Sequence, residues 1–173
     1  MLHLSGIHRL ALLAGLTVVS ALSSGGALAT PTGTAAPASS YSDQIRPLEI
    51  VVDRDPSRIA AAKRLARLHA EARDWAAALR VLERSAPFAA KDAEYQGFMG
   101  TVLRQLQRAS EAAAAYRRAI ALQSDDGRWW VGLGLALEQN GQKLEARQAF
   151  AAARERESSL PPALRKLAER RGR

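Results

Sequence analysis

The sequence predicts an all-α fold made of three copies of a helical hairpin, and three observations lead to this prediction. Residues 125–153 have the pattern of a helix, a tight turn and a second helix, and weaker copies precede them at a fixed spacing. Alanine, leucine and arginine dominate the 173 residues, and aromatic residues make up only 5%, a composition that favours helices over strands. Turn-forming residues interrupt each copy near its middle.

Composition and charge exclude some functions and leave others open. The chain is 47% hydrophobic, so it can bury one core. It has no cysteine, which rules out disulfides and cysteine metal sites. The net charge of +8 and the pI of about 10.7 suit nucleic acid, anionic envelope polymers or acidic proteins. Because basic and acidic residues are interleaved, a solvated helical surface also explains the charge.

Residues 1–29 have the pattern of a secretory signal. A short basic leader ending at Arg9 precedes an apolar run over residues 10–22 and an A-x-A pattern ending at Ala29. The apolar run is shorter than the roughly 20 residues that span a bilayer. We therefore predict export to the periplasm, with cleavage after Ala29. An uncleaved leader that stays as an anchor is the alternative.

Residues 30–56 are predicted to be a linker, mostly disordered, because the first part is small, polar and contains proline. Within it, residues 45–52 are apolar enough to form a short extended piece against the helical domain. Asp55 or Ser57 then caps the first repeat helix.

Five positions recur at one constant spacing across three windows, which indicates a structural repeat rather than a chance pattern of alanines. Small residues at these positions let two helix backbones approach, and a large residue fills the space against the next copy. The positions are Ala66, Gly100 and Gly134; Ala78, Ala112 and Ala146; Leu82, Tyr116 and Phe150; Ser85, Ala119 and Ala153; and Leu65, Met99 and Leu133.

The period and the small-large-small spacing resemble the tetratricopeptide repeat, whose unit is roughly 34 residues long. The resemblance implies a right-handed α-solenoid over residues 57–160, with repeats at 59–92, 93–126 and 127–160. The third repeat fits best, and Trp130 stands at one of its packing positions. A last helix within residues 161–173 would cover the end of the stack, as terminal caps do in solenoids.

The predicted helices and their ends follow from periodicity and turn chemistry. Asp74 and Ser110 are predicted to cap second helices, Gly141 to break the chain in repeat three, and Asp126 to lie at a helix N-terminus. The predicted helices are 58–71, 75–86, 92–106, 109–122, 126–139, 143–156 and 160–171.

The sequence offers little for catalysis, and we predict neither an enzyme, nor a cofactor, nor a metal site. His69 is the one histidine after the leader, and packing explains it better than chemistry. Gly132 and Gly134 lie inside a helix and do not form a phosphate loop. Trp130 is expected in the core. For Trp129, exposure for binding and burial against repeat two both remain open.

The family resemblance places partner binding on the concave face formed by first helices. Carried over to this chain, the face has a basic N-terminal part that suits an acidic or carboxylate-bearing peptide, although a solvated charged face is the alternative. Gly97 falls on the same face. The predicted partner-binding residues are Lys63, Arg67, Glu71, Thr101, Arg104, Gln105, Arg128, Val131, Leu135, Glu138 and Gln139.

The C-terminal half, with the stretch from Asp125 to Gln142, resembles envelope repeat proteins of type IV pilus biogenesis, the mannose-sensitive haemagglutinin class. The resulting hypothesis is an exported scaffold that binds an envelope protein or peptide, with pilus or secretion-system assembly as its setting. We expect no nucleic-acid partner and only transient membrane contact through the leader; self-association stays open. The alternative is a basic binder of anionic polymer, either nucleic acid or cell-wall glycan.

Overall fold

The computed structural model describes residues 41–172, and the predicted signal and cleavage site lie outside them. The described residues form eight α-helices and two short 3-10 helices, with no strand among them. The α-helices are α1 (Tyr41–Arg54), α2 (Ile59–Glu71), α3 (Trp75–Ser85), α4 (Ala93–Gln105), α5 (Ala109–Leu122), α6 (Gly127–Gln139), α7 (Lys143–Arg154) and α8 (Pro162–Arg171); the 3-10 helices are Ala86–Phe88 and Glu157–Ser159.

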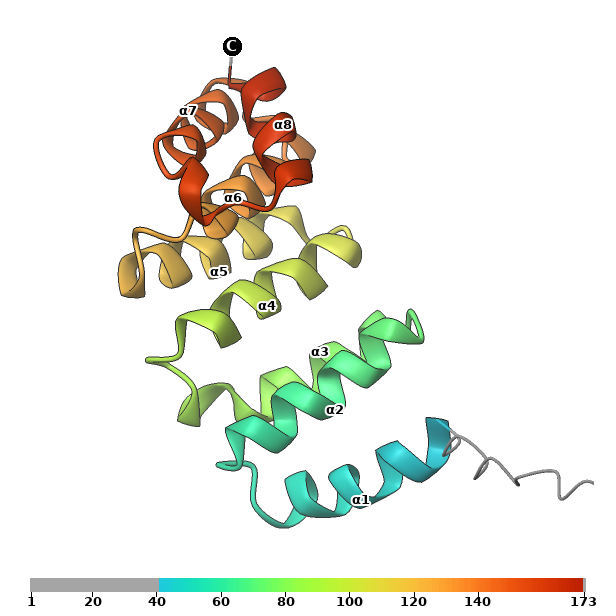
Figure 1. The fold of residues 1–173 in the computed structure, drawn as a ribbon. Helices are drawn as coiled ribbons and strands as arrows, with labels where there is room; N and C mark the ends of the chain where they lie inside the picture. The colour runs from blue at the N-terminus through green and yellow to red at the C-terminus, as the bar shows by residue number, and fades with distance from the viewer. Residues whose placement is uncertain (1–40, 173) are drawn as a thin grey trace, which may run out of the picture. The chain divides into compact units, whose positions relative to one another are not determined.

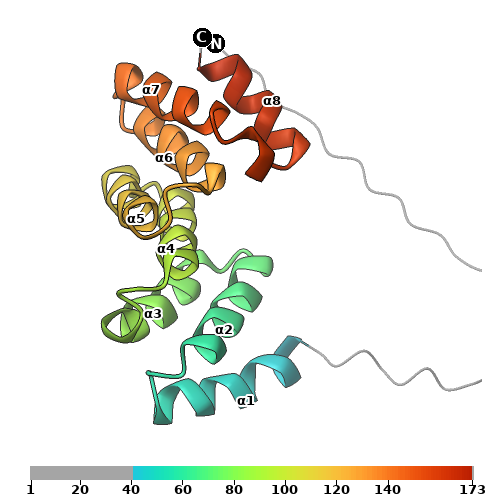
Figure 2. The same ribbon diagram turned by 60° about the vertical axis from the view of Figure 1, so that its left-hand side comes forward.

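Three antiparallel helix pairs, α2–α3, α4–α5 and α6–α7, follow one another in chain order (Figure 1). A second view shows α1 beside α2 at one end of this series and α8 beside α7 at the other (Figure 2). The predicted all-α solenoid of three helix-turn-helix repeats with a terminal helix is confirmed, and the seven predicted helices agree with the structure to within two residues at each end. Pro162 is the first residue of α8, where its missing backbone N–H costs no helical hydrogen bond.

The prediction of a linker up to residue 56, with an extended piece over 45–52, is wrong for the described part, because residues 41–54 form helix α1. The helix buries Ile45 and Val52 against Ala62 and Leu65 of α2. Its interior Pro47 removes one backbone donor, which is why the segment lacks an ordinary helical signature. Tertiary packing of one apolar stripe compensates for that weakness.

Both terminal helices continue the phase of the repeats. In α1, Ile45 and Leu48 lie one repeat length before Leu79 and Leu82 of α3, so α1 occupies the place of a second helix. In α8, Ala168 lies one repeat length after Gly134 of α6, so α8 occupies the place of a first helix. Ala168 is fully buried. The array therefore has half a repeat at each end of its three complete repeats.

The turn between the two helices of each repeat has one conformation, repeated three times. Arg73, Gln107 and Gly141 stand at the same repeat position and have φ angles of 62°, 61° and 79°. After each of them, the backbone N–H of the next residue donates to a carbonyl five residues back, as Asp74 N does to His69 O at 2.8 Å. Only Gly141 has the residue type that adopts this left-handed conformation without cost.

We expect Arg73→Gly and Gln107→Gly each to raise the free energy of unfolding by about 0.5–1 kcal/mol, because glycine relieves the left-handed strain. Gly141→Ala should lower it by about 1 kcal/mol, although a Cβ there meets no neighbour within 4 Å. Urea titrations of the three variants measure these changes. Equal loss of stability in all three would show that the turns do not carry this strain.

Side-chain caps are present at the starts of α3, α4 and α6, which agree only in part with the predicted positions. Asp74 accepts a hydrogen bond from Ala77 N at 2.9 Å, and Asp126 accepts one from Arg128 N at 2.9 Å. The prediction of a Ser110 cap is wrong, because α5 begins one residue earlier, after Arg108. Asp55 and Ser57 do not cap α2, which starts after Arg58. Asp55 instead accepts from the backbone of Ser57 in the preceding turn.

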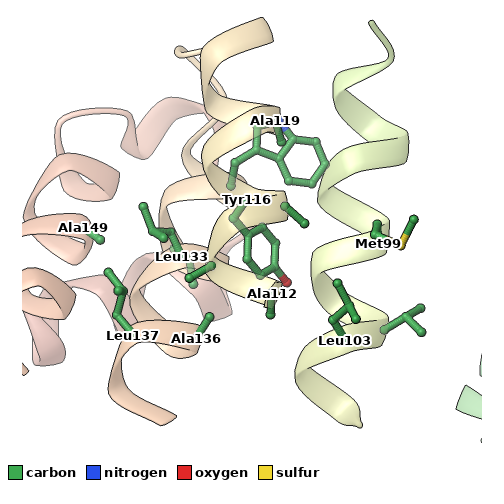
Figure 3. Packing of buried hydrophobic residues seen from close by; sticks show 14 of the residues in the cluster. Met99, Leu103, Ala112, Tyr116, Ala119, Leu133, Ala136, Leu137 and Ala149 are labelled. Carbon is green, nitrogen blue, oxygen red and sulfur yellow. The ribbon is translucent and has the colours of Figure 1, made fainter. Parts of the chain in front are cut away.

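The core runs through the repeats, and Tyr116 is its central side chain. Figure 3 shows Tyr116 of α5 between Met99 of α4 and Leu133 of α6. A Cβ on Gly100 would lie 2.9 Å from the Tyr116 ring, and one on Gly132 would overlap it. All fifteen predicted recurring positions are buried, whereas Trp130 is half-buried. The buried positions are Leu65, Ala66, Ala78, Leu82, Ser85, Met99, Gly100, Ala112, Tyr116, Ala119, Leu133, Gly134, Ala146, Phe150 and Ala153.

Candidate partner-binding face

The residues predicted to bind a partner lie on the first helices α2, α4 and α6, and we call the side that carries them the first-helix face. Five of them are exposed, five half-buried and one buried. The exposed ones are Arg67, Glu71, Gln105, Arg128 and Gln139; the half-buried ones are Lys63, Thr101, Arg104, Leu135 and Glu138; the buried one is Val131.

The basic side chains of α2 contact carboxylates at the start of α4. Lys63 Nζ lies 2.9 Å from both Asp92 Oδ2 and Glu94 Oε2, and Arg67 Nη2 lies 2.5 Å from Glu94 Oε1. The Arg67 guanidinium also lies over the ring of Phe98, 5.9 Å from its centroid. The face is therefore less basic than the sequence suggested, because Asp92 and Glu94 at the start of α4 supply the counter-charges.

These contacts shift the pKa values of Lys63, Asp92 and Glu94 toward the charged forms. Burial disfavours charged Lys63, but its hydrogen bonds to Glu94 and Asp92 outweigh burial and raise its pKa. Burial likewise opposes the charge on Asp92, yet hydrogen bonds from Tyr95 N and Lys63 lower its pKa. For Glu94 the hydrogen bond from Lys63 is the largest cause and lowers the pKa.

This cluster makes stability depend on pH at the acidic end. Because Asp92 and Glu94 have folded pKa values below their ordinary values of 3.8 and 4.5, the unfolded chain binds more protons in acid. The contribution of Asp92 and Glu94 to the free energy of unfolding is present above pH 4.5, and it is lost as pH falls through their folded pKa values. Lys63 acts oppositely, and its contribution is lost only as pH rises beyond 10.5.

We expect Glu94→Gln to make the free energy of unfolding less dependent on pH between roughly 5 and 3. Urea titrations at several pH values measure the slope for the native chain and the variant. The matched control is Glu145→Gln, an exposed carboxylate on α7, which should leave the slope nearly unchanged. Parallel slopes for the native chain and Glu94→Gln would contradict the assignment.

First helices of repeats two and three touch directly through Gly97 and Trp129. A Cβ on Gly97 would overlap the Trp129 ring, so glycine is what allows this approach. Trp129 is 8% exposed, and the guanidinium of Arg128 lies 4.9 Å from its ring centroid. Arg128 Nη2 is also 2.6 Å from Asp126 Oδ2. Of the two alternatives for Trp129, burial against repeat two is correct.

Trp130, which is predicted in the core, is half-buried and packs against the core, so it is less buried than Trp129. Its Nε1 donates to the carbonyl of Ser124 at 2.9 Å, and the Arg156 guanidinium lies 4.9 Å from its ring centroid. Arg156 Nε donates to the same carbonyl at 2.6 Å. The indole therefore links the connection between α5 and α6 to the start of α6.

Farther along the first-helix face, polar groups link α4 with the neighbouring helices. Thr101 Oγ1 donates to Gly97 O at 3.2 Å and lies 2.9 Å from the Tyr116 hydroxyl. Gln139 Nε2 donates to Arg104 O at 3.3 Å. Thr101 and Gln139 thus support the structure of the face in addition to lining it.

Val131 cannot take part in binding, because it is only 2% exposed and belongs to the core. Sequence reasoning also missed Asp92, Glu94 and Phe98, which shape the charge of the face. One signal was available: Glu94 and Arg128 occupy the same position in successive repeats. Opposite charges at one repeat position indicate contacts between repeats rather than a uniformly basic surface.

His69 contacts helix α1 and does not join a catalytic group. The Tyr41 hydroxyl lies 3.1 Å from His69 Nδ1, and the two rings meet edge to face with centroids 6.3 Å apart. Across residues 41–172, no three His, Cys, Asp or Glu side chains converge as metal ligands would. None of the helices in that range is both long and apolar enough to span a membrane.

Comparison with known proteins identifies the fold. Residues 99–161 match the model of the tetratricopeptide repeat family. A crystal structure of MamA superposes with a TM-score of 0.66 and 19% identity, over 76% of this chain and 84% of that chain. The fold is that of a tetratricopeptide repeat solenoid.

Two further neighbours of known structure agree with this fold. MamA 41-end from Desulfovibrio magneticus RS-1 has a TM-score of 0.62 and 20% identity, over 69% of this chain and 67% of that chain. The Sgt2 TPR domain from Aspergillus fumigatus has a TM-score of 0.58 and 16% identity, over 64% of this chain and 74% of that chain. At these identities the likeness concerns the fold alone. No curated protein matches the chain.

Proposed function

We propose that this tetratricopeptide solenoid is an exported, non-catalytic scaffold that holds an envelope protein or peptide on its first-helix face. One observation carries the proposal. Glu71, Gln105 and Gln139 share a position in the three successive repeats, and all three are exposed. Successive repeats thus offer equivalent contact points, which suits an extended peptide better than a small molecule.

Site-specific crosslinking in intact cells tests this proposal. A photo-crosslinking amino acid at Gln105 or Gln139 should capture the same envelope protein. The control position is Arg117, which is exposed on the second helix α5 and should not capture it. Capture from Arg117 with equal yield, or no product from any position, would contradict binding on the first-helix face.

A more specific form of this proposal is that the partner is acidic. Binding of such a partner requires existing ion pairs of the face to break. Such a partner must replace Glu94 as the counter-ion of Lys63 and Arg67. Glu94→Gln would then tighten binding of the captured partner, because both cations lose a competitor. Weaker binding by this variant would show that Glu94 itself contacts the partner.

Export and a setting in pilus or secretion-system assembly complete the proposal, and they rest on the leader and on the sequence resemblance of the C-terminal half. Export through a cleaved signal implies a mature protein that begins at Thr30, which mass spectrometry of the protein from cells can measure. Retention of residues 1–29 would favour the anchored alternative.

Binding of an anionic polymer is the second candidate, and the net charge of +8 is what favours it. Binding that falls steeply with salt and does not depend on polymer sequence would support it. The crosslinking result separates the two candidates, since a polymer binder gives no single captured protein.

A further inference from the structure

Four basic side chains line one cavity where α6, α7 and α8 meet. Lys143 and Arg147 come from α7, and Arg170 and Arg171 from the end of α8. The cavity has a volume of about 380 Å³, and Glu138 at the end of α6 contributes its one carboxylate. We call this the α7–α8 basic cavity.

The chain brings these charges together only by folding. Lys143 and Arg170 are far apart in sequence, and they meet because α8 packs on α7. Arg171 Nη1 lies 2.5 Å from Glu138 Oε2, so this pair is neutral. Lys143, Arg147 and Arg170 then remain as an excess of positive charge in one cavity.

The excess of positive charge is confined to this cavity and is not part of a uniformly basic surface. A second cavity beside the same two helices is lined by Glu155, Glu157 and Glu169, with Arg154 as its only cation. Charges of opposite sign are therefore segregated between the two cavities. A dispersed, solvated set of basic residues would not produce this separation.

Helix stability explains only part of the cluster. Arg170 and Arg171 lie in the last turn of α8, where the helix dipole favours cations. Lys143 is the first residue of α7, where the dipole disfavours a cation. Lys143, Arg147 and Arg170 are exposed, so water screens much of their mutual repulsion, and a counter-ion in the cavity would lower it further.

We propose that the α7–α8 basic cavity binds a phosphate group, carried either by a small soluble compound or by a lipid headgroup. A phosphate dianion offers three acceptor oxygens and matches donors from several side chains at once. A carboxylate has one charge and two oxygens and leaves more of the excess uncompensated. This site is separate from the proposed partner contacts at Glu71, Gln105 and Gln139.

Titration of the purified chain with inorganic pyrophosphate tests the site, with acetate as the carboxylate comparison. Arg147→Gln combined with Arg170→Gln should weaken pyrophosphate binding by about tenfold or more, because two charge-assisted contacts are lost. The matched control is Arg46→Gln combined with Arg117→Gln, which removes the same charge from exposed positions elsewhere and should retain binding.

A parallel arm uses vesicles of phosphatidylcholine with or without phosphatidic acid. Binding to phosphatidic acid vesicles that the cavity variant loses assigns the phosphate to a lipid; binding of pyrophosphate alone assigns it to a soluble compound. Equal losses in the cavity and control variants would overturn the proposal, as would acetate binding as tight as pyrophosphate. The proposal would also be overturned if neither pyrophosphate nor the phosphatidic acid vesicles bound.

Discussion

Replacement of Tyr116 by alanine is expected to lower the free energy of unfolding by about 3–5 kcal/mol. Tyr116 is 3% exposed, and its ring lies against Gly100 of α4 and Gly132 of α6. It therefore packs against both of the helices that flank α5. Alanine would leave a cavity at the junction of repeats two and three, where these helices cannot fully collapse.

The control variant Tyr116→Phe separates the stabilising contribution of the ring from that of its hydroxyl. Phenylalanine keeps the packing and loses the hydroxyl, which lies 2.9 Å from Thr101 Oγ1 and also interacts with Arg104, so we expect a loss of about 1 kcal/mol. Urea titrations followed by circular dichroism measure both values. If the alanine variant were no less stable than the phenylalanine variant, the Tyr116 ring would not stabilise the packing between repeats two and three.

Gly132→Ala is expected to destabilise the chain by about 1–3 kcal/mol through overpacking. A helical position normally gains up to about 1 kcal/mol when alanine replaces glycine. Here the new methyl would overlap the Tyr116 ring, which is held on its other side by Gly100. The steric cost should exceed the gain in helix propensity, and the same titrations measure the difference.

Much of the fold could be predicted because its signals are local and periodic. The repeat period placed every helix from α2 to α7, and Gly141 marked one inter-helix turn. Arg73 and Gln107 adopt the same turn without a residue type that favours it, so sequence chemistry could not reveal them. Helix α1 was missed because Pro47 hides a stripe that only packing on α2 stabilises.

The candidate face was harder to predict, because its properties depend on contacts between repeats. The family resemblance predicted which helices form the face. It did not predict that Val131 is buried or that Lys63 pairs with Glu94 of the next repeat. The α7–α8 basic cavity combines residues from three helices, so no linear pattern indicates it. Electrostatic inferences from sequence fail wherever the counter-charge lies on another repeat.

The tryptophan- and glycine-rich stretch at the start of α6 packs against neighbouring helices, as the repeat spacing predicts for Gly134. Gly132 accommodates Tyr116, Gly134 accommodates Phe150, and Trp129 covers Gly97. This assignment directs the search for function away from these side chains. Function is to be sought on the first-helix face and in the basic cavity.

A double-mutant cycle between Gly132→Ala and Tyr116→Ala tests that assignment most directly. In the native chain the alanine at position 132 should destabilise, but in the Tyr116→Ala chain the ring is absent and the methyl has room. There we expect Gly132→Ala to raise the free energy of unfolding, by up to about 1 kcal/mol. A reversal of sign is the predicted result; additive effects of the two substitutions would contradict it.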